Sequence, residues 1–427
     1  MQGGRSVQRS ESFCVAQLGA RMHYAVPRIF YRAGVLGRLY TDICAVNGWP
    51  RLLRALPSAL RPPTLRRLLG RVPRGLPRDR ITAFSSFGLE YARRRAAGGN
   101  RAEGTAVHLW AGRTFCELIL RHDLDGVSGV YTFNSAGLEL LRHARERGLL
   151  CVMEQTIAPA GVEDELLAAE CTAFPDWQPP RGGDVHRAEF ADRERAEWEC
   201  ADLVVCGSEF VRSGIAESGA PVRRCVVVPY GLDAGTSVHG RQEPGRRLRV
   251  LVGGAVCLRK GAPYVLGAAC AAKALAEFRW CGKVALLPTA SSRLGQHVDL
   301  RGPVARSEMA EHYAWADVFL LPSICEGSAT VCYEALAAGL PVITTPNAGS
   351  VVRDGIDGFV VPIRDGEAIA QKLELLARDH ERLAWMSANA IARSREYTLE
   401  KYGERLLAAI AKGQPRASGK MLSAQPF

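Results

Sequence analysis

Short apolar runs alternate with helix-forming segments along both halves of the chain, and this alternation restricts the possible folds more than any other feature. Segments with helical periodicity, such as SAGLELLRHARERG (135–148), separate most of these runs. Strands separated by helices predict parallel sheets with helices on both faces, an α/β fold. The strand-like runs are SFCVAQLG (12–19), RLYTDICA (38–45), SGVYTF (128–133), LLCVMEQ (149–155), ADLVVCGS (201–208), RRCVVVPYG (223–231), LRVLVGGA (248–255), DVFLLPS (317–323), LPVITT (340–345) and GFVVP (358–362).

The 427 residues are enough for two such units. Residues 156–188 are rich in Pro and Gly and lack clear periodicity, so no regular element is predicted there. Doubly wound sheets bind ligands at the carboxyl ends of their strands, so we expect the site in a cleft between two facing domains. The predicted parts are an N-terminal domain (1–233), a polar Gly-rich linker (234–247), a C-terminal domain (248–395), a helix crossing back to the first domain (396–411) and a disordered tail (412–427).

Composition narrows the class of protein further. Hydrophobic residues make up 47% of the chain, as in ordinary globular domains. No apolar run approaches the ~18 residues of a membrane-spanning helix, and the polar N-terminus lacks the core of a secretory signal. Thirteen scattered cysteines with no CxxC pair predict reduced thiols rather than disulfides or a zinc site. We therefore expect a cytoplasmic protein, either soluble or peripheral on the inner face of the membrane.

The positive charge is concentrated in the first part of the chain. Residues 1–150 hold 24 Arg, no Lys and ten acidic residues, a net charge of +14, whereas the rest of the chain carries −3. The segment 51–80 alone has nine Arg, one acid and interleaved leucines. It fits an anionic membrane surface, and an Arg-rich solvated hairpin fits the same pattern. Nucleic acid fits less well, because the segment has no aromatic side chain on which bases stack.

The most informative motif is the strand–turn–helix ICEGSATVCYEALAAGLPVITT (324–345). A helix that begins in this turn directs its free amides and the positive end of its dipole to the carboxyl edge of the sheet, where they suit a phosphate. Glu326 lies in the turn and Glu334 on the helix, and carboxylates accept hydrogen bonds from vicinal sugar hydroxyls. Taken without this context, a solvated helix face is the better interpretation of the pair.

A second loop, from Gly254 to Gly261, carries two cations after a strand. Arg259 and Lys260 stand at the mouth of the predicted sheet, and Lys260 is the first lysine of the whole chain. Two such cations can neutralise a diphosphate. The loop is not a Walker A motif, because GxxxxGK[ST] is absent, and an exposed basic loop is the alternative.

From about residue 197 to 410 the chain resembles the retaining GT-B glycosyltransferases of family 4. The resemblance implies two Rossmann-like domains across a cleft, and transfer of a sugar from a nucleotide-sugar with retention of configuration. It covers roughly half the chain; the first 195 residues match only in general layout. The matching segments are AEWECADLVVCGSEFVRSGI, VVVPYGLD, VGGAVCLRKGAPYVL, ADVFLLPSICEGSATVCYEALAAGLPVITT and GSVVRDGIDGFVVP.

The resemblance assigns roles to the C-terminal motifs. It places Glu326 against the donor sugar, Glu334 on the ribose and Lys260 on the donor diphosphate. The family usually has Arg five residues before that lysine, where this chain has Ala255, and Arg259 is expected to compensate. The other expected donor contacts are Gly254 and the backbone amides of Gly327, Ser328 and Ala329.

The N-terminal domain departs more from the family. Where the family often has a His after a strand, this chain has Glu154 and Gln155, which are expected to act on the sugar; a strand-end capping pair is the alternative. Where the family often has a Gly-Gly pair in the loop after the first strand, this chain has Gly19 followed by Ala20. Gly19, His23 and Asn134 are candidates for the acceptor side.

These features together predict a glycosyltransferase with a nucleotide-sugar donor, UDP-sugars being favoured over GDP-sugars. No cofactor and no metal are expected, because the pair Asp123 and Asp125 follows a helix and is interpreted as a loop rather than a metal motif. The expected acceptor is a glycan or a lipid-linked glycan. Two alternatives stay open: a nucleotide-sugar epimerase on the same fold, and an inactive scaffold that binds a glycan or a membrane.

Overall fold

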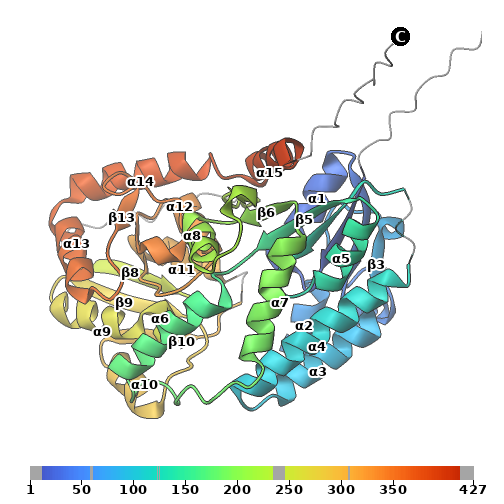
Figure 1. Cartoon of the computed structure of the whole chain (residues 1–427). Coiled ribbons are helices and arrows are strands. Elements are labelled where there is room, and N and C mark those ends of the chain that lie inside the picture. The colour runs from blue at the N-terminus through green and yellow to red at the C-terminus, as the bar shows by residue number, and fades with distance from the viewer. Residues whose placement is uncertain are drawn as a thin grey trace, which may run out of the picture.

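Two parallel β-sheets, each covered by helices on both faces, make up the molecule (Figure 1). The computed structural model describes residues 12–57, 61–122, 124, 126–233, 246–305 and 308–413. The tail after 413, most of the predicted linker, and Asp123 and Asp125 lie outside these residues. Within the described part, no helix is long and apolar enough to span a bilayer.

The N-terminal domain is built on a seven-stranded sheet of order β3-β2-β1-β4-β5-β6-β7, with every neighbouring pair parallel. Its strands are β1 (Phe13–Gln17), β2 (Leu36–Thr41), β3 (Ile81–Ala83), β4 (Gly129–Phe133), β5 (Leu150–Gln155), β6 (Leu203–Cys206) and β7 (Cys225–Val227). Its helices are η1 (Arg21–His23), α1 (Ala25–Arg32), η2 (Trp49–Ala55), α2 (Pro63–Leu69), η4 (Arg78–Arg80), α3 (Ser85–Ala97), α4 (Arg101–Leu120), α5 (Leu138–Glu146), α6 (Ala160–Ala173), α7 (Arg187–Cys200), α8 (Glu209–Glu217) and η5 (Val222–Arg224).

The C-terminal domain repeats the plan with six parallel strands in the order β10-β9-β8-β11-β12-β13. Its strands are β8 (Leu248–Gly253), β9 (Ala276–Cys281), β10 (Val298–Gly302), β11 (Val318–Leu321), β12 (Val342–Thr344) and β13 (Gly358–Val360). Its helices are η6 (Leu258–Lys260), α9 (Ala262–Ala271), α10 (Pro288–Gly295), α11 (Met309–Trp315), α12 (Thr330–Ala337), η7 (Pro346–Ala348), α13 (Gly366–Arg378), α14 (His380–Ser394) and α15 (Leu399–Gly413).

Alternation along the strands fills a core on each face of both sheets. In β1, Val15 packs in the cluster that contains residues of α1 and α15, whereas Cys14 and Ala16 pack with α4 and α5. Successive strand residues point to opposite faces, so a fully apolar strand buries both of its sides. The alternating pattern read from the sequence therefore gives the doubly wound sheets that were predicted.

Helix α15 runs from the C-terminal domain to the N-terminal one (Figure 1). The backbone of Leu232 pairs with the segment just before and at its start, through Tyr397 O and Leu399 N. Farther along α15, the ring of Tyr402 packs edge-on against Tyr230. The last helix thus holds the two domains together.

The structure corrects the sequence interpretation in one long segment. The Pro- and Gly-rich stretch 156–188 contains helix α6, for which no regular element was predicted. The N–H of Ala160, at the start of α6, donates to Glu194 of the N-terminal domain, and Glu170 accepts from Tyr264 of the C-terminal domain. Because α6 contacts both domains, it lacks the single apolar stripe by which a helix is predicted from sequence.

Candidate active site

A cavity of about 470 Å³ lies between the two domains. The N-terminal domain contributes the loop after β1 and residues near Asp233, and the C-terminal domain contributes α11 and α12. Of the predicted residues, His23 of the N-terminal domain and Glu334 of the C-terminal domain line this cavity. The predicted location in an interdomain cleft agrees with this position.

The loop after β1 is held in an unusual conformation. Met22, His23 and Tyr24 all have positive φ, at 45°, 51° and 59°, in the left-handed region that non-glycine residues rarely adopt. The predicted residue Gly19, also at positive φ, donates its N–H to Asp42 (3.0 Å), and its carbonyl accepts from Gln17 (3.1 Å). Backbone strain of this kind persists only where surrounding contacts enforce it, and it is concentrated at functional sites.

Glu334 lies on α12 and faces α11. Its Oε2 accepts a hydrogen bond from the hydroxyl of Tyr313 (3.0 Å), and both residues line the cavity together with Thr330. A carboxylate oriented by a phenol at a cavity wall suits the hydrogen-bonding of a diol. The ribose contact expected of Glu334 stays a prediction.

Glu326 and the two cations of the second loop form one charged cluster. Oε1 of Glu326 lies 2.5 Å from Nζ of Lys260, and the same oxygen accepts from Arg259. Arg259 also donates to the carbonyl of Cys325 (2.9 Å). All three residues were predicted to contact the donor, and the structure brings them together, although neither Glu326 nor Lys260 lines the interdomain cavity.

Gly254 allows Lys260 to reach this position. Its φ is +102°, and a Cβ there would lie 3.1 Å from Cε of Lys260. Any larger residue would meet both backbone strain and the lysine side chain. Lys260 itself is 6% exposed, so its charge is balanced by Glu326 in a largely buried place.

The turn between β11 and α12 packs tightly on the N-terminal domain. A Cβ on Gly327 would lie 2.0 Å from the carbonyl oxygen of Thr156, and Gly327 forms an antiparallel bridge with Ile157. Ser328 shares a hydrogen bond with Tyr333 through its hydroxyl (2.9 Å).

The backbone at this turn corrects one expectation. The N–H of Ala329 donates to the carbonyl of Ala348 (3.1 Å), so it is not a free amide for a phosphate. The hydrogen bond joins the turn to η7, and a contact between segments this far apart in the chain cannot be predicted from a sequence pattern.

Gln155 does not present its side chain to the cleft, contrary to prediction. It is fully buried, and its Nε2 donates to Glu194 (2.6 Å) and to the carbonyl of Ile157 (3.0 Å). Its Oε1 accepts from the indole of Trp198 (3.0 Å). These bonds join β5 to α7, so the side chain acts as a structural link.

Glu154 is likewise engaged in the core. Its two carboxylate oxygens accept from the hydroxyls of Tyr131 (2.7 Å) and Tyr230 (2.8 Å), and it is 1% exposed. Burial raises the pKa of both tyrosines, so both stay protonated as donors. Nε of Arg21 lies 3.7 Å from Oε1 of Glu154, and this ion pair connects the buried network to the strained loop after β1. The strand-end alternative considered for this pair is therefore the one that fits the geometry.

Asn134, the remaining candidate, follows β4. Its side-chain oxygen accepts from the N–H (3.2 Å) and the hydroxyl (2.7 Å) of Thr156, and it lines a separate cavity in the N-terminal domain. It thus lies at the carboxyl edge of the sheet, but not in the cavity that contains Glu334.

Sequence reasoning missed Arg28 and Asp233, which line the large cavity. Arg28 donates two hydrogen bonds to Asp233, at 3.0 and 2.8 Å, and these bonds lower the pKa of the carboxyl group. No local pattern links residues so far apart. Among the described residues, no group of His, Cys, Asp and Glu is arranged to hold a metal ion.

Two doubly wound domains that face each other across such a cavity define the GT-B architecture. Solved structures of this class align over nearly the whole chain. HepE from Anabaena, in complex with UDP and glucose, aligns with a TM-score of 0.58 and 14% identity, covering 94% of this chain and 100% of that one. Sucrose-phosphate synthase from Thermosynechococcus elongatus aligns with a TM-score of 0.61 and 15% identity, covering 94% and 98%. At this identity the likeness establishes the fold.

Sequence comparison identifies the C-terminal domain more closely. Residues 247–379 match the family model of glycosyl transferases group 1, so this part of the chain is a domain of that group. D-inositol 3-phosphate glycosyltransferase of Kineococcus radiotolerans is 30% identical over 250 residues, 48% of this chain and 57% of the relative. Sucrose synthase of Acidithiobacillus caldus is 37% identical over 97 residues, 21% and 12% of the two chains. The match thus spans little more than half the length of the first relative.

Proposed function

We propose that the protein is a glycosyltransferase that moves a sugar from a nucleotide-sugar, with a UDP-sugar favoured, to an acceptor hydroxyl. The observation that carries this proposal is the cavity at which Glu334, on the domain that matches glycosyl transferases group 1, faces the N-terminal loop. Two crystal structures of one protein with this fold, HepE from Anabaena, hold ligands of this kind: UDP in one, UDP and glucose in the other.

The charged cluster supplies a mechanism for the proposed reaction. When the donor diphosphate arrives, its charge competes with Glu326 for Lys260 and Arg259. The two cations then stabilise the negative charge that develops on the leaving diphosphate, which is why we propose that no metal is needed. Glu326, released from its partners, becomes free to accept hydrogen bonds from the donor sugar. Retention of configuration is part of the proposal, and NMR of the product anomer checks it.

The acceptor that we propose is a glycan or lipid-linked glycan. A membrane-bound acceptor agrees with the exposed apolar side chains of Trp49, Leu52 and Leu56, which are accompanied by exposed Arg51 and Arg54. We propose that this surface, defined here as the 49–56 surface, docks on an anionic membrane from the cytoplasmic side.

An inactive scaffold is the second candidate, and one observation favours it. The position at which the family often has a His is occupied by Glu154 and Gln155, whose polar atoms are engaged in the core. Such a scaffold would bind nucleotide without turnover.

A thermal-shift panel of UDP, GDP, ADP and their sugars tests the proposal on the wild type and on Glu334→Ala. A ligand at a hundred times its Kd adds about 2.7 kcal/mol, which predicts a rise in Tm on the order of 5–10 °C. We expect a shift with uridine ligands that is reduced in the variant, and turnover of a UDP-sugar. Glu311→Ala, an exposed carboxylate on α11, is the matched control. No shift with any nucleotide would contradict the donor site, and binding without turnover would favour the scaffold.

A further inference from the structure

The segment 174–178 follows α6 in the first half of the sequence, yet it packs into the core of the C-terminal domain. Trp177 is 4% exposed and belongs to the apolar cluster that contains residues of β8, β9 and α9. Its carbonyl accepts from the N–H of Leu287 (2.8 Å), and the guanidinium of Arg293 lies over its ring. The C-terminal domain is therefore completed by a part of the chain that precedes it by some distance.

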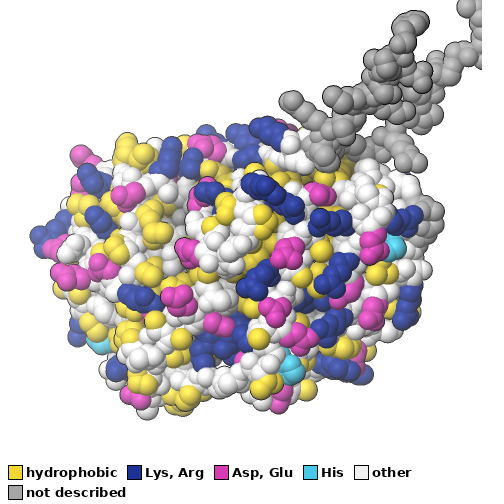
Figure 2. All heavy atoms as spheres, viewed as in Figure 1, with side chains coloured by type: hydrophobic (Ala, Val, Ile, Leu, Met, Phe, Trp, Pro, Cys, Tyr) yellow, Lys and Arg dark blue, Asp and Glu magenta, His cyan; other side chains and the backbone are white. Residues whose placement is uncertain are grey.

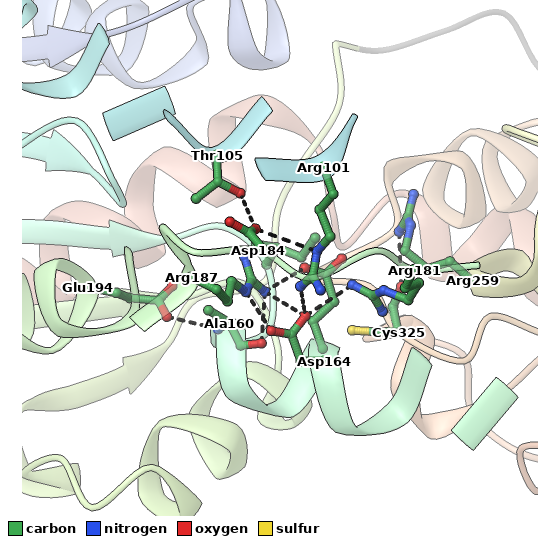
Figure 3. Close-up of polar contacts among 12 residues, drawn as sticks. Arg101, Thr105, Ala160, Asp164, Arg181, Asp184, Arg187, Glu194, Arg259 and Cys325 are labelled. Atoms are coloured by element: carbon green, nitrogen blue, oxygen red, sulfur yellow. Dashed lines mark hydrogen bonds and ion pairs between the residues drawn. The ribbon is translucent and has the colours of Figure 1, made fainter. Parts of the chain in front are cut away.

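Helix α6 begins in the N-terminal domain and is anchored there (Figure 3). Its Asp164 accepts hydrogen bonds from three guanidinium groups on separate segments. These groups belong to Arg101, Arg181 (3.0 Å) and Arg187 (2.5 and 3.0 Å). The first turns of the helix are thus held by α4, by α7 and by the loop before α7.

The last turn of α6 is anchored in the C-terminal domain instead. Glu170 is fully buried and accepts from the hydroxyl of Tyr264 (3.0 Å) and from Arg364 (2.6 Å). The ring of Phe174 packs edge-on against the rings of Tyr264 and Trp177. Because each end of the helix is fixed in a different domain, α6 delivers the residues that follow it to a defined place on the second sheet.

The side-chain amide of Gln178 joins the two loops that follow β8 and β9. These loops pair in parallel: the N–H of Val256 donates to the carbonyl of Lys283 (2.9 Å), and the N–H of Ala285 donates to the carbonyl of Val256 (3.0 Å). In a parallel ladder the next bond would run from the N–H of Leu258 to the carbonyl of Ala285. Gln178 lies between these two groups, because its Oε1 accepts from Leu258 (3.0 Å) and its Nε2 donates to Ala285 (2.8 Å).

The position of this amide bears on the two cations of the second loop. Leu258 is buried and is the first residue of η6, so its N–H is one of the donors that a helical turn leaves without an internal partner. A buried N–H without an acceptor is costly, and a primary amide supplies the acceptor together with a donor for the neighbouring loop. Arg259 and Lys260 are the next two residues, so Gln178 fixes the backbone directly before both of them.

We infer that Gln178 is a positioning residue for Arg259 and Lys260, and that its amide holds the 254–261 loop in the conformation in which both cations meet at Glu326. The consequence for ligands rests on the proposed function, in which these cations contact the donor diphosphate. Gln178 then sets the affinity for the diphosphate part of the nucleotide and leaves the affinity for the nucleoside part unchanged.

Hydrogen–deuterium exchange of the full chain without any ligand tests the positioning itself. Gln178→Met keeps the length of the side chain but has no N–H donor and no carbonyl oxygen, so it removes both bonds. We expect exchange in the peptide that covers Leu258 to become about tenfold faster, because its amide loses its acceptor. Peptides from α12 are expected to exchange as in the wild type.

Affinity for a nucleotide and for its nucleoside tests the consequence. We expect Gln178→Met to weaken binding of UDP about tenfold and to leave binding of uridine unchanged, as measured by NMR titration. If the wild type binds GDP or ADP instead, that nucleotide and its nucleoside take the place of the pair. Gln371→Met is the matched control, because Gln371 is exposed on α13 and its amide donates to Glu367 of the same helix. This control is expected to alter neither exchange nor binding.

Three outcomes would overturn the inference. The first is unchanged exchange around Leu258 in Gln178→Met, and the second is faster exchange throughout the C-terminal domain, which would show general loosening. The third is an equal loss of affinity for UDP and uridine, or no loss for either. A wild type that binds no nucleotide would contradict the proposed donor site, whereas the exchange measurement would still decide whether Gln178 holds the loop.

Discussion

Glu197 shows how one buried carboxylate supports the carboxyl edge of the N-terminal sheet. It lies on α7 and accepts from the N–H groups of Ser135 (2.7 Å) and Gly137 (3.0 Å), in the turn directly after Asn134. Ser135 has a φ of 66°, so the turn is strained and depends on this support. Burial raises the pKa of Glu197 to about 7.

This raised pKa makes the free energy of unfolding depend on pH. The folded state keeps the proton of Glu197 to a higher pH than the unfolded state does, so the stabilisation is complete below the unfolded pKa and is lost as pH rises through about 7. Between about pH 5 and about pH 8 the loss amounts to about 3 kcal/mol. Urea unfolding of the wild type and Glu197→Gln measures it, and the variant is expected to show a smaller decline. Glu199→Gln, exposed on the same helix, serves as control; an equal decline in all three proteins would contradict the prediction.

At the scale of elements, the turn before α12 determines how closely the domains approach. Gly327 contacts Thr156 and Ile157 directly, and its carbonyl accepts from the hydroxyl of Ser208 (2.5 Å). The charged cluster of Glu326 is therefore enclosed by the N-terminal domain in this structure. If a donor binds at this cluster, as we propose, it enters while these contacts are loosened, and binding is then linked to domain movement.

Gly327→Ala tests this contact. The new methyl group would overlap the carbonyl of Thr156, and overpacking of this kind typically costs about 1–3 kcal/mol. The expected result is a lower Tm together with a larger radius of gyration by X-ray scattering. The control is Gly267→Ala, on the open face of α9 with nothing within 4 Å, which should raise stability by roughly 0.5–1 kcal/mol. An unchanged Tm in Gly327→Ala would show that the domains do not meet at this turn in solution.

For the whole molecule, the distribution of charge bears on the membrane proposal. Basic and acidic side chains are interspersed over the face shown in Figure 2, so the excess of arginine in the first 150 residues forms no continuous basic surface there. The 49–56 surface differs, because it combines Leu52, which is 74% exposed, with Arg51 and Arg54. An exposed leucine flanked by arginines suits the headgroup region of an anionic bilayer.

Vesicle sedimentation tests the docking of this surface. We expect binding to vesicles that contain phosphatidylglycerol, little binding to phosphatidylcholine alone, and weakening at high salt. Leu52→Glu is expected to reduce the binding roughly tenfold, because it removes an inserting side chain and adds a repelled charge. Trp385→Glu, an exposed aromatic of the C-terminal domain, is the control. Equal binding of both variants would place the membrane contact elsewhere or exclude it.

The amino-acid sequence by itself determined the α/β alternation, the two doubly wound domains and the elements that carry Glu326, Lys260 and Glu334. These features depend on residues close together in the chain: apolar runs form strands, and Gly339 and Pro341 end the helix after Glu334. The preference of such a short segment for a strand, a turn or the end of a helix depends on its own residues and not on distant parts of the chain.

The tertiary structure decided which polar groups meet. Periodicity places Glu154 and Gln155 at the end of a strand, but only the packed helix α7 and the tyrosines around them show that their polar atoms are used in the core. Asp164 likewise gathers its arginines from three segments of the chain. The physical reason is that a buried polar group must satisfy its hydrogen bonds with whatever neighbour the fold supplies, and that neighbour is set by packing over long sequence separations.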